Sequence, residues 1–102
     1  MARVRQIVVD VLKPHDPPLV EFTQRVADVD GVDGVRATVL EIDREVQNVE
    51  LTVEGERLAF DAVEAAVDGQ GGTVHSVDAV TCGDHVEPPR SPAPRGTGRL
   101  RR

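Results

Sequence analysis

The stretch GVRATVLEIDREVQNVELTVE, residues 34–54, decides the fold because apolar and polar side chains alternate on both sides of a polar turn. Before the turn, Val35, Ala37 and Val39 share one face of an extended segment. After it, residues 49–54 alternate Val, Leu and Val with Glu, Thr and Glu. A period of two is typical of a β-strand with one buried face. We therefore predict two antiparallel strands joined by a polar hairpin over residues 43–48.

A helical pattern lies on each side of this hairpin. The first has its apolar residues at the spacing of one amphipathic stripe: Leu19, Phe22, Val26 and Val29. Gly31 provides a natural end for that helix, with Asp16 as a candidate N-cap at its start. The second helix is predicted over residues 58–68, and the glycine-rich residues 69–72 end it.

Two further extended segments complete the pattern, over residues 4–13 and 73–81. The order strand, helix, strand, strand, helix, strand is that of a ferredoxin-like α+β sandwich, βαββαβ. In this plan two helices cover one face of a four-stranded antiparallel sheet. The other sheet face is left to meet water, a ligand or another subunit. The fold class by itself implies no function.

The charge is unevenly distributed along the 102 residues. Residues 1–87 hold all 18 carboxylates against seven Lys and Arg, whereas residues 88–102 hold five Arg and no acid. We predict one domain over residues 1–86 and a disordered Pro- and Arg-rich tail over residues 87–102. An acidic body disfavours nucleic acid and anionic membranes as partners. One Lys against eleven Arg, with many Asp, suits a halophilic source or a GC-rich genome.

Several function classes lack their signals. Cys82 is the only cysteine, which excludes an internal disulfide. The N-terminal residues predict a strand rather than a signal peptide, and no apolar run is long enough for a membrane span, so we expect a cytoplasmic protein. No nucleophile elbow, phosphate loop or dinucleotide fingerprint is present, and we expect no enzyme.

Four runs carry a family resemblance: VVDVLKPHDP at residues 8–17, GVDGV at 31–35, VLEIDREVQNVELTVEGE at 39–56 and GGTVHSVDAV at 71–80. With these runs in this order, the chain resembles the archaeal domain of unknown function 211 family over about residues 3–84. The resemblance implies a ferredoxin-like fold, a homo-oligomer that closes into a ring, and no established catalytic activity. It also implies divalent cation binding, with calcium as the first candidate. The Arg-rich tail is not part of the family pattern.

The strand carboxylates are the first candidate site. Asp10 interrupts the apolar run IVVDVL, while Glu41 and Asp43 end the second strand. In a ferredoxin-like sheet the first and third strands are neighbours, so Asp10 is expected to face the same surface as Glu50 or Glu54. Clustered carboxylates repel one another unless a cation or a proton intervenes, and calcium and magnesium prefer several oxygen ligands. We expect Asp10, Glu41 and Asp43 to be metal ligands, or else part of a solvated acidic face.

The corner between the first strand and the first helix is the second candidate. Lys13, His15 and Asp16 are expected at a ligand or subunit interface, because helix N-termini attract anions. The alternative function is a small-molecule sensor in which this corner and the GVDGV turn form an anion or amino-acid pocket between subunits. His15 is also a candidate pH-sensitive contact between subunits, and loop chemistry alone also explains the segment.

Two further expectations concern metals and assembly. His75, Asp78, Cys82, Asp84 and His85 form a loose run of residue types that can hold zinc or another transition metal, but their spacing is not that of a recognised metal site. We interpret His75 as an ordinary strand residue and Cys82 as a partly buried one. Self-association is expected through the sheet edges or the uncovered face, with an apolar contribution from four residues: Val8, Leu12, Leu40 and Ile42.

Overall fold

Six elements follow the predicted order in the computed structural model, which describes residues 1–84. They are β1 (Val4–Pro14), α1 (Leu19–Ala27), β2 (Gly34–Ile42), β3 (Val46–Glu54), α2 (Phe60–Asp68) and β4 (Thr73–Cys82). The predicted tail over residues 87–102 lies outside the described residues. Within residues 1–84, no helix is long and apolar enough to cross a membrane.

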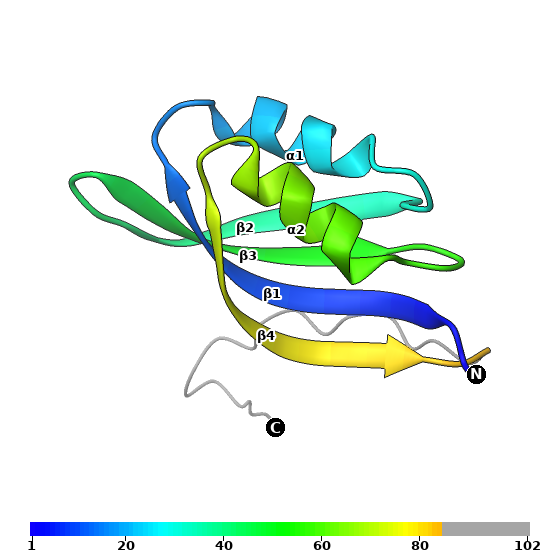
Figure 1. The fold of residues 1–102 in the computed structure, drawn as a ribbon. Helices are drawn as coiled ribbons and strands as arrows, with labels where there is room; N and C mark the ends of the chain where they lie inside the picture. The colour runs from blue at the N-terminus through cyan, green and yellow to red at the C-terminus, as the bar shows by residue number, and fades with distance from the viewer. Residues whose placement is uncertain (85–102) are drawn as a thin grey trace, which may run out of the picture.

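The four strands form one antiparallel sheet in the order β2-β3-β1-β4. Figure 1 shows both helices on the same side of the sheet, with β2 and β4 as its edge strands. This arrangement is the ferredoxin-like fold, and it confirms the predicted pairing of the first strand with the third and of the second with the third.

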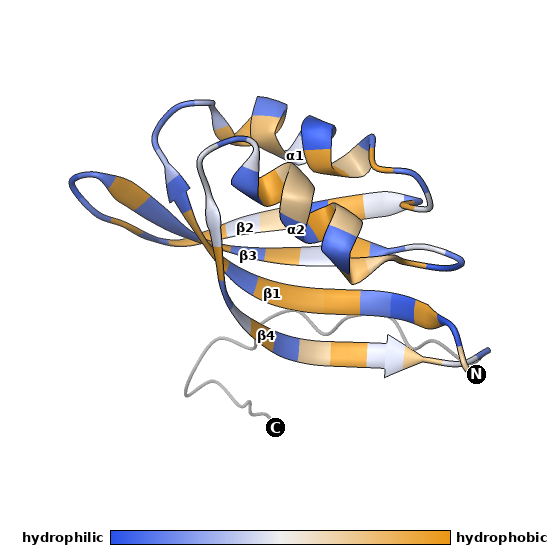
Figure 2. Ribbon diagram, in the orientation of Figure 1, coloured by the Kyte–Doolittle hydropathy of each residue, from blue (hydrophilic) through white to orange (hydrophobic). Residues whose placement is uncertain are grey.

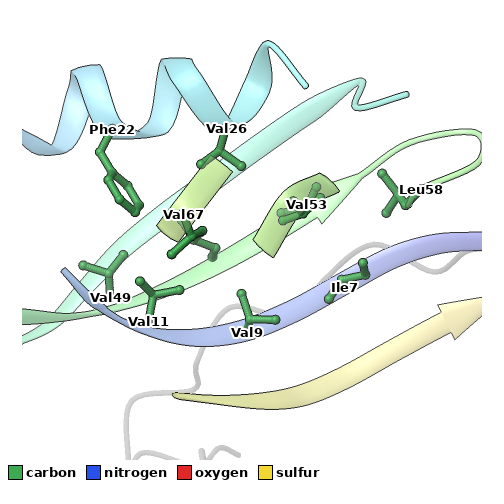
Figure 3. Close-up of a cluster of buried hydrophobic side chains, with 11 residues drawn as sticks. Ile7, Val9, Val11, Phe22, Val26, Val49, Val53, Leu58 and Val67 are labelled. Carbon is green, nitrogen blue, oxygen red and sulfur yellow. The ribbon is translucent and has the colours of Figure 1, made fainter. Parts of the chain in front are cut away.

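The core lies between the helices and one sheet face. Eleven apolar residues are buried there, and seven of them are Val. The bands of apolar residues along β1 and β3 in Figure 2 mark the strands that supply most of them. In Figure 3 the Phe22 ring of α1 points down toward Val49 and Val11 of the sheet. Burying a side chain of this size stabilises the folded state by roughly 1.5–3 kcal/mol.

Both helices are shorter than the sequence predicts. The first ends at Ala27 rather than Val29, because the main-chain N–H of Asp28 bonds back to Gln24 O while that of Val29 bonds to Val26 O. The second begins at Phe60 rather than Leu58, because the N–H of Leu58 donates to Val4 O across to β1. Leu58 thus packs in the core and connects the start of α2 to the sheet.

Close backbone contact explains one glycine. A Cβ built on Gly55 falls 2.0 Å from the carbonyl oxygen of Gly31, which leaves no room for a side chain where the turn after β3 passes the end of α1. This contact was not predictable from the sequence, since Gly55 and Gly31 are far apart along the chain.

Candidate functional site

The helix-free face of the sheet carries the first candidate residue. Ile7, Val9 and Val11 are buried toward the helices, so Asp10 faces the other way. The register pairs Asp10 with Glu50 of β3. The prediction that Asp10 and Glu50 face the same surface is therefore confirmed.

A β-bulge in β2 brings Glu41 to the same face. The register pairs Val39 with Val49 but Glu41 with Asn48, so Leu40 is the extra residue. Asn48 in turn pairs with Leu12 on the helix-free face. If β2 paired regularly with β3, Leu40 would lie opposite Asn48 and Glu41 would point to the helix side of the sheet, since successive strand residues alternate between faces.

These residues border one hollow of about 300 Å³ on the helix-free face. It is lined by residues from all four strands and the β2–β3 hairpin: Asp10, Leu12, Glu41, Asp43, Val46, Asn48 and His75. All three predicted metal ligands lie on this hollow. Asn48 and His75 join them, and only His75 had been singled out from the sequence.

Asn48 orients the Asp10 carboxylate. Its Nδ2–H donates to Asp10 Oδ1 over 2.7 Å, and Asp10 is half-buried beside it. Asn48 was missed in the sequence because an amide in a polar stretch carries no signal of its own. The available signal was its position two residues before Glu50, which places both side chains on one sheet face.

His15 holds the hairpin that carries Asp43. Its Nε2–H donates to two main-chain carbonyl oxygens, at 2.9 Å to Asp43 and 3.1 Å to Arg44. Asp43 Oδ1 also accepts a hydrogen bond of 2.8 Å from the N–H of Arg44, which restrains the Asp43 side chain. His15 thus connects the corner after β1 to the border of the hollow.

Lys13 is completely buried, which the sequence did not indicate. Its ammonium donates to Pro14 O at 2.8 Å, to His15 O at 3.5 Å and to Gln47 Oε1 at 3.2 Å. It also lies 5.7 Å from the centre of the Phe22 ring. Burial lowers the pKa of Lys13 from its ordinary value of 10.5, and the charge of Asp16 opposes that change. The three donors of this ammonium are occupied inside the chain, so they are not available to an external anion.

Asp16 is exposed and does not cap α1. The N-cap residue is Pro18, and no side chain bonds to the first turn. The candidate role of Asp16 as an N-cap is wrong, because two further prolines separate it from the helix.

The loose run around β4 is divided between two ends of the strand. His75 lies on the hollow, whereas Cys82 pairs with Val4 at the far end of β1. Cys82 is exposed, so the expectation that it is partly buried is wrong. Asp78 accepts a hydrogen bond of 2.8 Å from Ser76 Oγ, and Asp84 pairs with Arg3. His85 lies outside the described residues.

The carboxylates meet at one hollow but not at coordination distance. Across residues 1–84, no three His, Cys, Asp or Glu side chains are close enough together to hold a metal ion. Ion binding would therefore require rotation of the exposed Glu41 and Asp43 side chains, bridging waters or ligands from a second copy.

The fold and this hollow define a small ferredoxin-like protein with a carboxylate-lined sheet face. A family model for domain of unknown function 211, described as "Uncharacterized ArCR, COG1888", matches residues 5–92. Uncharacterized protein MJ0319 of Methanocaldococcus jannaschii is 41% identical over 96 residues, which cover 93% of this chain and 99% of that protein. The chain belongs to the archaeal domain of unknown function 211 family, and the resemblance carried by its strand and turn motifs is confirmed.

Proposed function

We propose that the chain is a cytoplasmic, non-catalytic binding or regulatory module that assembles with copies of itself and binds a divalent cation. Calcium is the first candidate and magnesium the second. The observation that carries this proposal is that Asp10 borders the same hollow as Glu41 and Asp43, which lie about 30 residues further along the chain. The bulge at Leu40 and the His15 hydrogen bonds both favour this convergence.

The composition of the hollow favours a hard cation. Three carboxylates and the side-chain amide of Asn48 offer oxygen ligands, which calcium and magnesium prefer. A bound cation would also relieve the repulsion among these carboxylates. The net charge of −6 raises the local concentration of cations around the chain.

Exposed apolar residues support self-assembly. Leu40 and Ile42 of β2 are 51% and 66% exposed, and Val77 and Val80 of β4 are 47% and 54% exposed. These residues lie on the two edge strands, where unpaired backbone groups favour pairing with another chain. We propose a head-to-tail assembly that closes into a ring.

The alternative function, a small-molecule sensor, is less well supported. The corner at Lys13 and the turn before β2 lie at opposite ends of the sheet, because Lys13 pairs with Gln47 whereas Gly34 pairs with Glu54. A pocket formed by both would need two copies of the chain. The buried ammonium of Lys13 would also have to leave its three internal partners to bind an anion.

Thermal unfolding and titration calorimetry test the cation. With calcium or magnesium about 100-fold above the dissociation constant, we expect a gain in unfolding free energy of about 2.7 kcal/mol, which chelator reverses. Asp10→Asn and Glu41→Gln are expected to reduce this gain. Glu45→Gln is the matched control, because Glu45 is exposed on the same hairpin but does not line the hollow. The proposal would be ruled out if neither cation shifted the melting temperature and neither Asp10→Asn nor Glu41→Gln had any effect on it.

Sedimentation velocity tests the assembly. We expect a single species larger than the 11.0 kDa monomer at both low and high salt, because apolar contacts persist when charges are screened. A monomer at high protein concentration would contradict the self-assembly part of the proposal.

A further inference from the structure

Both edges of the sheet carry apolar side chains on its helix-covered side. Val77 pairs with Val9 and Val80 with Ile7, and both of these partners are buried beneath the helices. Val77 and Val80 are half exposed on β4. Figure 1 shows β4 at the edge of the sheet.

The opposite edge offers a matching apolar hollow. It lies between α1 and β2, has a volume of about 410 Å³, and is lined by Leu19, Val20, Val35 and Ala37 among others. Val20 is 69% exposed at its rim. The side chains of Val35 and Ala37 point to the helix side of the sheet, since they pair with the buried residues Val53 and Leu51. The two apolar features thus lie on the same side of the sheet at its two edges.

The strand directions permit these edges to meet. Every neighbouring pair in the order β2-β3-β1-β4 is antiparallel, so β2 and β4 run in opposite directions. A second copy placed beside the first in the same orientation brings its β4 antiparallel to β2. The helices of both copies then stay on the same side of one continuous sheet.

We propose that β4 of one copy pairs with β2 of the next and that Val77 and Val80 cover the hollow between α1 and β2. This inference rests on the proposed self-assembly and names the surface that carries it. The contact is head-to-tail, because each copy uses its β4 on one side and its β2 on the other.

A β-bulge and two charges set the register. The register against β1 shifts between Val77 and Ala79, which makes Asp78 an extra residue. With Val77 opposite Ala37, Val80 is therefore opposite Val35. Asp78 then lies beside Arg36, and both side chains are exposed, with no ion pair among the described residues. The two edges are complementary in charge as well as in apolar surface.

Cysteine cross-linking tests this register directly. In the proposed register, Cys82 of one copy lies opposite Asp33 of the next. Cys82 is the only cysteine of the chain. Opposed residues in antiparallel strands have Cα atoms about 4.5–5.5 Å apart, within the range that a disulfide spans. We expect mild oxidation of the full-length Asp33→Cys variant to give a ladder of covalent oligomers that reductant collapses. Asp68→Cys is the control, because Asp68 is also exposed but ends α2 and is not part of an edge strand.

The outcomes separate this interface from the assembly as a whole. Oligomers in sedimentation without a ladder would overturn the β4–β2 contact while leaving self-assembly intact. A covalent dimer of the unmodified chain through two Cys82 residues would show a symmetric β4–β4 contact and overturn it as well. A monomer in sedimentation would remove the proposed assembly itself.

A charge exchange tests the same register without cysteine chemistry. We expect Arg36→Asp and Asp78→Arg each to weaken the oligomer at low salt, and the two changes together to restore it. Failure of the double variant to recover the oligomer would contradict the pairing of Asp78 with Arg36.

Discussion

His15 and Asp43 are joined by a hydrogen bond of 2.9 Å from the imidazole Nε2–H to a main-chain carbonyl oxygen, although 28 residues separate them along the chain. The same N–H also reaches the carbonyl oxygen of Arg44. The loop before α1 is thereby fastened to the hairpin between β2 and β3, and this hairpin forms one border of the carboxylate-lined hollow.

The first prediction concerns this contact. We expect His15→Ala to release the hairpin, with a loss of about 1 kcal/mol in unfolding free energy and faster amide hydrogen exchange in residues 44–46. His15→Gln retains an N–H donor and is expected to recover part of the protection. Asp16→Ala serves as the control, because Asp16 is exposed and only one residue away. Equal exchange in the His15→Ala and wild-type hairpins would contradict the proposed restraint.

The second prediction concerns the pH dependence of stability at Lys13. Burial lowers the pKa of Lys13 in the folded chain below its ordinary 10.5, so the folded state releases this proton at a lower pH than the unfolded state. Between these two pKa values the unfolded state binds more protons, and the Lys13 contribution to stability therefore rises with pH. Lys13→Met removes the titrating group while keeping a long apolar stem.

Urea unfolding of both chains at increasing alkaline pH measures this effect. We expect the stability of the wild-type chain to rise relative to that of Lys13→Met as the pH passes through the folded-state pKa toward 10.5. Taking the difference between the two chains cancels the titration of the other groups they share. A difference that stays constant or falls over this range would show that Lys13 does not titrate in the expected direction.

The third prediction compares two leucines on neighbouring strands. Leu51 of β3 is fully buried, whereas Leu40 of β2 is 51% exposed. We expect Leu51→Ala to cost about 2–5 kcal/mol of unfolding free energy, because it leaves a cavity beneath the helices. Leu40→Ala is expected to change it by less than about 0.5 kcal/mol in the monomer. Chemical unfolding of the two variants measures this difference in unfolding free energy. Similar losses of unfolding free energy in both variants would contradict the described core.

The fourth prediction concerns two glycines of the β2–β3 half of the fold. A Cβ on Gly55 would collide with the carbonyl oxygen of Gly31, which is backbone and has little freedom to move. We expect Gly55→Ala to cost about 1–3 kcal/mol or more. Gly34→Ala is the matched control, since its Cβ would meet nothing within 4 Å. Thermal melts that rank these two variants in the opposite order would refute the close approach of the two turns.

Strand and helix periodicity was sufficient to predict the fold. The alternation of Val49, Leu51 and Val53 marks the buried face of β3 correctly, since all three are fully buried. The amphipathic stripe through Phe22 and Val26 likewise predicts the face of α1 that packs on the sheet. These patterns are visible in one segment at a time because burial of a face requires a local period.

The details of the hollow depend on contacts between segments and were only partly predictable. Asp10 stood out because it interrupts an apolar run, and Glu41 and Asp43 because they end a strand. The burial of Lys13 was not predictable, because it depends on carbonyl oxygens and on Gln47, which the fold brings together. The bulges in β2 and β4 were also missed, since an extra residue is defined only by the register of the partner strand.

Leu40 is the extra residue near the end of β2. Because Leu40 has no partner on β3, its deletion would leave Val39 opposite Val49 and Glu41 opposite Asn48, and both side chains would keep their sides of the sheet. A deletion of three nucleotides in the gene would thus remove the bulge from β2 without removing the acidic side chain from the hollow. A one-residue gap at this position in a relative would therefore not imply the loss of its acidic ligand.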